Sequence, residues 1–288
     1  MHREQNTMIT PELDQALNSL EIELSVMGDR KKIVLSDFDY TLCDQYAFNP
    51  QTNNHLADID PEVVAAAERQ CLIVATSRRA TNPTVPLMWE SGLVPPHLPV
   101  IVENGGSILF RGSHGEIECI DLIRSEDMQE LAEMRQLAVE LIHDIPAGQR
   151  LIFKMGRTML LARLQDEHGS SLPHHQQWLA ERLRAIMSSS PLQVVDTRVS
   201  VTVQHADVNK GTAFRKYLEL TGVLRDSIYV IGMGDGENDI ELFNEADLRL
   251  GFSEAVASFV DIDIPHGPRA VPHIFKVIES SNAPDRTW

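Results

Sequence analysis

The sequence predicts an α/β protein with a Rossmann-like, doubly wound parallel sheet as its core and an inserted α+β domain. Two observations predict this fold. Near both ends of the chain, short apolar runs that end in polar residues alternate with amphipathic segments, as in parallel sheets covered by helices. Between them the expected order changes to helix, two strands, helix, two strands, which is typical of an antiparallel sheet with helices on one face. We therefore predict core residues 1–111, an inserted domain at 112–206 and core residues 207–288.

Composition and charge exclude several classes of protein. The 288 residues include 42 acidic and 25 basic side chains, a formal net charge of −17, which argues against nucleic acid or an anionic membrane as a partner. The N-terminal stretch is mixed and acidic, and no segment reaches the ~18 apolar residues of a spanning helix. Cys43, Cys71 and Cys119 are dispersed and lack metal-ligand spacing. We therefore expect a cytoplasmic protein without a signal peptide or membrane anchor.

The first core segment contains the strand around which the rest is organised. Thr10-Pro11-Glu12 precedes an amphipathic stretch and predicts a helix within residues 10–28. The run KKIVLS predicts a buried strand, and the polar residues 43–60 after it predict a long loop or a small hairpin over the strand end. Further along we expect a helix from Asp60-Pro61, a strand at 71–76, a helix at 84–91 and a hairpin that turns at Asn104-Gly105-Gly106.

The remaining elements follow from the same patterns. In the insertion we expect a helix at 124–144, two strands around Gly156-Arg157, a helix at 174–188 and two strands within 192–204. In the last segment we expect a helix at 212–222, a buried strand at 228–233, a helix at 240–246, a strand at 247–252 and a final helix near 270–280.

Polar side chains of a consistent kind follow the predicted core strands. Asp37 and Asp39 end the first strand, Thr76-Ser77 ends the second, Lys210 begins a helix, and Asp235 and Asp239 follow the strand at 228–233. Each piece alone also fits a helix or turn cap. Together they predict a site at the carboxyl edge of the sheet. Several converging carboxylates need a hard cation, and all-oxygen ligands suit Mg²⁺. A lysine and a hydroxyl there would bind an anion.

At these motifs the sequence resembles the haloacid dehalogenase-like phosphohydrolases. DFDYTL is similar to their first motif, VATSR to the second, NKG to the third and GDGENDIEL to the fourth. An insertion between the second and third motifs, and the segment VENGGSIL before it, resemble the C2-capped branch that contains Cof-type proteins and sugar phosphatases such as those for trehalose 6-phosphate, sucrose phosphate and mannosyl-3-phosphoglycerate.

The resemblance implies a role for each matching residue. Asp37 would be the nucleophile and a Mg²⁺ ligand, and Asp39 the general acid/base that binds the metal through its backbone carbonyl. Thr76, Ser77 and Lys210 would hold the phosphoryl group, Asp235 would bind Mg²⁺, and Asn238 and Asp239 would support the metal. These roles together predict a phosphatase that forms an aspartyl-phosphate on Asp37 and hydrolyses a small phosphorylated molecule.

The inserted domain is expected to act as a lid that selects the substrate. Lys154 and Arg163 resemble the Lys and Arg on the cap strands of trehalose-6-phosphate phosphatases, but Leu161 stands where histidine is usual and the last cap strand, VSVTVQH, has no acid. We therefore predict a sugar or polyol phosphate. Candidate substrate contacts are Glu103, Asn104, Lys154, Arg157 and Arg163, and solvated surface charge is the alternative for the three basic residues.

Other activities use the same motifs. A phosphomutase or phosphotransferase would pass the phosphoryl group from Asp37 to a sugar. A non-catalytic sugar-phosphate sensor is a third hypothesis, although a sensor has no need of the proton donor Asp39. A dehalogenase fits less well, because the second aspartate and the full set of metal ligands favour phosphate chemistry.

Overall fold

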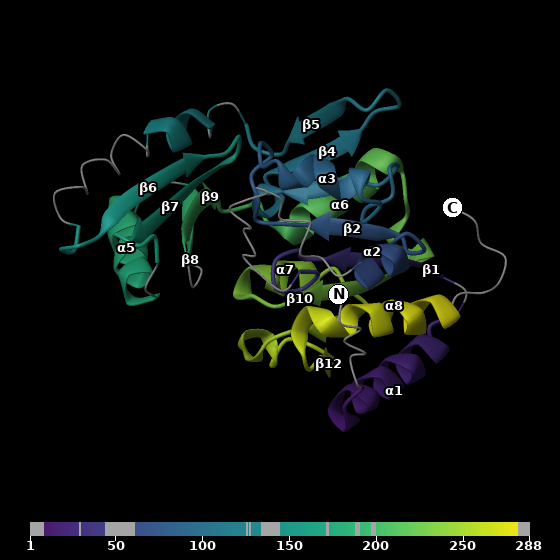
Figure 1. Cartoon of the computed structure of the whole chain (residues 1–288). Coiled ribbons are helices and arrows are strands. Elements are labelled where there is room, and N and C mark those ends of the chain that lie inside the picture. The colour runs from purple at the N-terminus through teal and green to yellow at the C-terminus, as the bar shows by residue number, and fades with distance from the viewer. Residues whose placement is uncertain are drawn as a thin grey trace, which may run out of the picture.

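The computed structural model describes residues 9–28, 30–43, 61–124, 126, 128–133, 145–170, 173–187, 191–196 and 200–281. Within these residues the chain forms two sheets. The larger has eight strands in the order β12-β11-β10-β1-β2-β3-β4-β5, and the smaller has four in the order β6-β7-β9-β8. The smaller sheet and its helix lie to the left of the larger one in Figure 1. This is the predicted fold class, a parallel-rich α/β core with a separate antiparallel sheet.

The strands of the larger sheet are short and mostly apolar, as expected for strands buried on both faces. The pairs β11–β10, β10–β1, β1–β2 and β2–β3 are parallel, and β12 is parallel to β11. β4 and β5 add to the β3 edge in antiparallel orientation. The bounds are β1 Lys31–Ser36, β2 Leu72–Ala75, β3 Val100–Val102, β4 Ser107–Arg111, β5 Ile117–Asp121, β10 Ile228–Gly234, β11 Leu248–Gly251 and β12 Ile262–Asp263.

Helices cover the larger sheet and contribute to its core. Thr10 caps the first helix through its hydroxyl, which accepts from the Leu13 N–H, and Pro11 occupies the first turn, as the sequence predicts. Asn209 caps the helix that begins at Lys210: its side-chain oxygen accepts from the Thr212 N–H, and the Thr212 hydroxyl accepts in return from the Asn209 N–H. The bounds are α1 Pro11–Ser25, α2 Pro61–Ala67, α3 Thr84–Glu90, α6 Lys210–Thr221, α7 Ile240–Phe243 and α8 Val271–Ser280.

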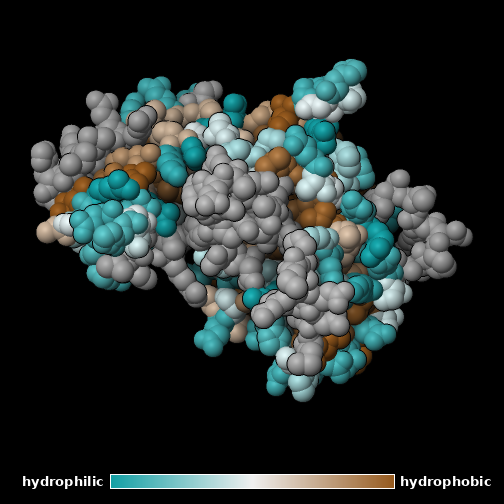
Figure 2. Space-filling view, in the orientation of Figure 1, coloured by the Kyte–Doolittle hydropathy of each residue, from teal (hydrophilic) through white to brown (hydrophobic). Residues whose placement is uncertain are grey.

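The smaller sheet has its own apolar core, formed with helix α5 (Pro173–Ile186). Leu160, Ala162 and Leu164 alternate along one strand and point to the helix side. The outward surface of α5 is hydrophilic (Figure 2). Helix α5 covers one face of the smaller sheet, and the opposite face of that sheet can contact the core. The strands are β6 Arg150–Met155, β7 Met159–Gln165, β8 Leu192–Asp196 and β9 Val201–His205.

One strand lies in a different place from the sequence expectation. We predicted that the insertion begins at residue 112, but β5 (Ile117–Asp121) pairs with β4 in the larger sheet. The turn at 112–116, closed by a bond from the Gly112 N–H to the Glu116 carbonyl, reverses the chain so that β5 extends the core. The smaller sheet starts only at β6. Its exact boundaries with the core, near 112 and 206, stay predictions.

Two predicted segments lie wholly or partly outside the described residues. The loop at 43–60 is described only at Cys43. Of the helix predicted at 124–144, residues 128–133 are helical and most of the rest is not described. No helix in the described ranges is both long enough and apolar enough to cross a membrane.

Candidate active site

The carboxyl ends of β1 and β10 bring the predicted acidic residues together. The two strands run parallel along their length, and the Asp37 N–H donates to the Met233 carbonyl at 2.8 Å. The residues that follow each strand therefore leave the sheet side by side. Carboxylate oxygens of Asp37, Asp235 and Asp239 all lie within 4.8 Å of one another.

Lys210 joins two of these carboxylates in a buried network. Its Nζ donates to Asp37 Oδ1, and at 2.6 Å to Asp239 Oδ1. The side chains of Lys210 and Asp239 are fully buried, and that of Asp37 nearly so. Burial without a partner would be costly for each charge, so the lysine and the two acids stabilise one another. The capped start of α6 places Lys210 there, since Asn209 is the N-cap.

The site carries more negative charge than Lys210 balances. Burial raises the pKa of Asp37 well above its usual range, opposed by Lys210 and reinforced by the neighbouring acids. Burial and then Asp239 raise the pKa of Asp235 to about 7. The pKa of Lys210 is raised above its ordinary value because Asp239 and Asp37 outweigh burial. Close carboxylates that resist ionisation together are a fitting donor set for a hard divalent cation. Mg²⁺ therefore fits the residues at this position.

The loop after β10 is shaped by Asp239. Its Oδ2 accepts from the N–H groups of Asp235 and Gly236, at 3.0 and 2.9 Å, while its Oδ1 accepts from Lys210. A side chain at Gly234 would overlap Asp239, whose Cβ lies 2.6 Å from the position of an added Cβ. Asp239 thus supports the loop and leaves Asp235 to face Asp37. Asn238 lies in the same turn, partly buried.

The second strand end brings a hydroxyl and two arginines to the site. Thr76 is buried, and its hydroxyl accepts from the Arg78 N–H at 3.1 Å, while Ser77 is partly exposed. Arg78 donates to both carboxylate oxygens of Asp39, at 2.5 and 3.1 Å, and to Thr84 at 3.0 Å. The Asp39 side chain is therefore directed toward Arg78.

The candidate substrate residues divide into two groups. Lys154 and Arg163 lie on the face of the smaller sheet opposite α5, on neighbouring strands, where Ile152 pairs with Arg163 and Lys154 with Leu161. On the same face, Gln204 accepts from the Asn104 side chain at 3.1 Å, so this face is turned toward the core. Burial, followed by Arg79 and Arg163, lowers the pKa of Lys154. Lys154 therefore lies within electrostatic range of both Arg79 and Arg163.

The other candidates are engaged in contacts between the two sheets. Glu103 is 1% exposed and accepts four hydrogen bonds, and Asn104 is buried against Gln204. Arg157 forms a two-pronged ion pair with Asp121, at 2.6 Å for the shortest contact. These side chains bind other parts of the protein in the structure, and their contact with a substrate stays a prediction.

Sequence reasoning gave no role to Arg78 and Arg79. Arg78 binds Asp39, and Arg79 donates to the Met155 carbonyl of β6 at 3.3 Å. Both follow directly after Thr76-Ser77, and two arginines beside a predicted anion site were the available signal. Their partners, however, come from segments distant in the chain, and the order of residues alone does not reveal them.

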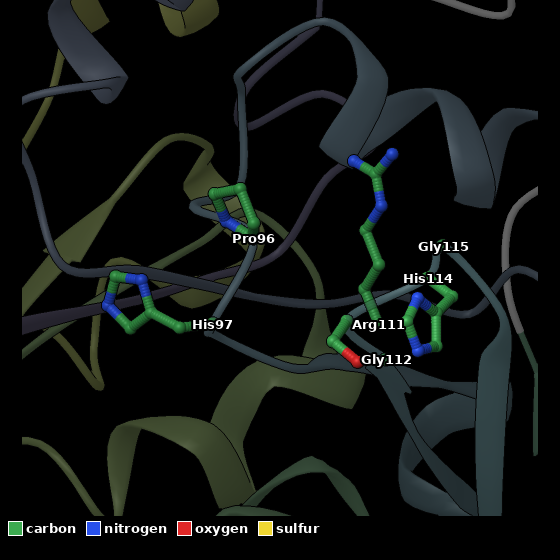
Figure 3. A pocket seen from close by; sticks show the side chains of 7 residues that line it. Pro96, His97, Arg111, Gly112, His114 and Gly115 are labelled. Carbon is green, nitrogen blue, oxygen red and sulfur yellow. The ribbon is translucent and has the colours of Figure 1, made fainter.

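A hollow of about 630 Å³ lies elsewhere on the core. It is lined by the loop at Pro96-His97 and the turn from Arg111 to Gly115 (Figure 3). Because β4 is antiparallel to β3, this turn lies at the amino end of β3, away from the carboxyl edge that carries Asp37. None of the predicted site residues lines it.

Comparisons of sequence identify related proteins. Residues 173–260 match the family model described as haloacid dehalogenase-like hydrolase. A phosphoglycolate phosphatase from Natronomonas pharaonis is 30% identical over 201 residues, which cover 69% of this chain and 79% of that protein. One from Methanosarcina acetivorans is 36% identical over 80 residues, covering 27% of this chain and only a third of that protein (33%).

Comparison of structure supports the same grouping at the level of fold. The C-terminal domain of the Candida albicans trehalose-6-phosphate phosphatase superposes with a TM-score of 0.63 at 14% identity, over 93% of this chain and 96% of that domain. At this identity the likeness concerns the fold alone.

Proposed function

We propose that this chain, which belongs to the haloacid dehalogenase-like hydrolases, is a Mg²⁺-dependent phosphatase that transfers a phosphoryl group to Asp37 and then to water. The observation that carries the proposal is the buried Asp37–Lys210–Asp239 network with Asp235 beside it, at the carboxyl ends of β1 and β10. Phosphoryl transfer requires positioning and charge neutralisation, and this arrangement supplies both.

Asp37 is placed to attack a phosphorus atom. A phosphoryl group at the strand end would be attacked by the Asp37 carboxylate, with the bond to the leaving oxygen breaking as the new O–P bond forms. Lys210 contacts Asp37 and would offset charge on the phosphoryl oxygens, and Thr76 and Ser77 would hold the group from the β2 side. Asp37, Asp235 and the Asp39 carbonyl would hold Mg²⁺, supported by Asn238 and Asp239. When bound, the ion supplies charge neutralisation at the transferred phosphoryl group.

Asp39 is proposed as the proton donor to the leaving alcohol and then the base for the attacking water. In the structure both of its oxygens accept hydrogen bonds from Arg78. The Asp39 side chain must therefore turn from Arg78 toward the leaving oxygen before it transfers a proton. Arg78 would hold it at the edge of the site until then.

The substrate is proposed to be a small phosphate ester that carries further polar or charged groups. A sugar or polyol phosphate is the class favoured by the sequence resemblance. The positive charges of Arg79 and Arg163 both act on Lys154, and such a group of cations, in a chain of net charge −17, favours an additional anionic group on the substrate, such as a carboxylate. Phosphoglycolate, for which the relatives are named, has that chemistry. The dispersed free thiols support a cytoplasmic location.

The test is release of inorganic phosphate from a panel of phosphate esters, with and without Mg²⁺. The panel should contain phosphoglycolate, sugar and polyol phosphates and p-nitrophenyl phosphate. We expect Mg²⁺-dependent release that EDTA abolishes. Transfer to a sugar without free phosphate would indicate the phosphotransferase alternative, and binding without any turnover would indicate a sensor.

A further inference from the structure

Glu103 connects three segments that are distant in the sequence. It follows β3 directly, and its carboxylate is buried between the core and the turn that joins β6 to β7. Oε1 accepts from the Ala80 N–H at 2.9 Å and the Arg157 N–H at 3.0 Å. Oε2 accepts from the Thr158 N–H at 2.7 Å and the Thr158 hydroxyl at 2.8 Å. One side chain therefore holds the loop after β2 and the β6–β7 turn in fixed relation.

The surroundings are built around this carboxylate. Glu103 and Asn104 have φ of +56° and +53°, a left-handed conformation that non-glycine residues adopt only where neighbouring structure enforces it. At Gly156 an added Cβ would lie 2.6 Å from the Glu103 carboxylate atoms. Because Gly156 has no side chain, the Glu103 carboxylate has space to pack against this turn. Three backbone N–H groups and one hydroxyl occupy both oxygens of the carboxylate.

The segments that Glu103 joins carry the cations around the proposed substrate site. Ala80 directly follows Arg79, on the loop that begins with Thr76. Arg157 and Thr158 lie between β6, which carries Lys154, and β7, which carries Arg163. Arg79 also donates to the Met155 carbonyl, at 3.3 Å, within the same contact. A shift of the β6–β7 turn would move Lys154 and Arg163 relative to Arg79 and to the nucleophile.

We propose that Glu103 is a positioning residue that assembles the Arg79, Lys154 and Arg163 cluster across the junction of the two sheets. It touches no reacting atom, and it acts through the backbone of the loop after β2 and of the β6–β7 turn. The consequence for substrate binding rests on the proposed function, whereas the linkage itself does not.

The linkage is tested by amide hydrogen exchange on three purified variants. Glu103→Gln keeps the shape but places an NH₂ group against N–H donors. Gly156→Ala disturbs the same contact from the other side. Glu118→Gln, on the exposed part of β5, is the matched control. We expect exchange at Ala80, Arg157 and Thr158 to become at least about tenfold faster in the first two variants and to stay unchanged in the control, with β1 and β10 still protected. Unchanged exchange at Arg157 and Thr158 in both variants would overturn the proposal.

Kinetics on phosphoglycolate, or on the best ester from the panel, separate positioning from folding. A displaced cluster raises KM, by about tenfold or more, with a smaller change in kcat. A loss of folded protein lowers apparent kcat and leaves KM unchanged, and that result would contradict the positioning role. If Glu103→Gln does not fold, Thr158→Val, which removes one donor, is expected to change KM in the same direction. Amide hydrogen exchange needs no substrate. It therefore tests the contact between Glu103 and the β6–β7 turn even if the protein has no phosphatase activity.

Discussion

The two sheets of this molecule hold their functional residues in different ways. In the larger sheet, Asp37, Lys210, Asp235 and Asp239 meet because β1 and β10 end, and the capped helix α6 begins, at the same edge. In the smaller sheet, Lys154 and Arg163 are held beside the core by contacts that Glu103, Arg79, Asn104 and Asp121 make across the junction. The comparison suggests that the core supplies the reaction and the smaller sheet supplies selection among substrates.

The first prediction addresses the core and has the largest effect. Asp37→Asn should abolish turnover on every phosphate ester, because an amide is a far poorer nucleophile and metal ligand. The protein should still fold, since Lys210 keeps Asp239 as a partner. Phosphate release and circular dichroism on the purified variant are the measurements. Turnover near that of the wild type would remove Asp37 from its proposed role.

The second prediction concerns the proton donor. Asp39→Asn should lower kcat by about 10²–10⁴-fold on all substrates, as is typical for loss of a general acid/base. Because the carboxylate lies against Arg78 and not against Lys210, the Asp37 network should be undisturbed. Steady-state kinetics of the variant measure kcat and KM separately. A change confined to KM would indicate that Asp39 binds substrate and does not transfer a proton.

The third prediction separates the two sheets. Lys154→Ala and Arg163→Ala should each lower kcat/KM on the preferred substrate by about ten- to a hundredfold, since a charged hydrogen bond contributes about 1.5–3 kcal/mol. The loss on p-nitrophenyl phosphate should be much smaller, because that ester offers these cations no anionic partner. The control is Arg184→Ala, at an exposed position of α5, the helix on the other face of the smaller sheet. Equal losses on both esters would contradict a role in selection.

The fourth prediction has the smallest effect and concerns charge in the core. The pKa of Asp235 is raised in the folded protein to about 7, mainly by burial and then by Asp239, against about 3.9 in an unfolded chain. Without metal, this carboxyl group therefore contributes stability that is present at low pH and lost as pH rises through about 4 to 7. Mg²⁺ competes with the proton, so it should raise Tm more at pH 8 than at pH 5.5.

The size of that effect follows from mass action. Mg²⁺ at ten times its Kd contributes about 1.4 kcal/mol, which corresponds to roughly 2–3 °C in Tm for a chain of 288 residues. Thermal unfolding with Mg²⁺ or EDTA at the two pH values measures it, and Asp235→Asn should reduce the difference. An equal gain at both pH values would argue against metal binding at this carboxylate.

The fold and the core residues were accessible from the sequence because their signals are local. An apolar strand followed directly by Asp37, or by Asp235 and Asp239, is visible in a short window, and parallel strands bring such ends together. The contacts of Glu103 with Ala80 and Thr158, and of Arg157 with Asp121, join distant segments and depend on the tertiary fold. The sequence around Glu103 therefore does not reveal its buried contacts, and the place of β5 beside β4 depends on the single turn at 112–116.

The backbone conformation of Tyr40 is another feature that the local sequence pattern does not predict. It adopts φ of +61° directly after Asp39 and is exposed. A left-handed conformation favours glycine, which has no Cβ to clash with the backbone. The tyrosine therefore adopts the conformation of a glycine there, at some cost in backbone strain.

The most direct test of the central claim is to look for the phosphoryl group on Asp37. The wild-type protein is mixed with Mg²⁺ and its best phosphate ester, quenched rapidly in acid, digested and analysed by mass spectrometry. We expect the added mass of one phosphoryl group on the peptide that contains Asp37, absent without Mg²⁺ and absent in Asp37→Asn. Rapid phosphate release with no phosphorylated peptide, or with the group on a different residue, would contradict it.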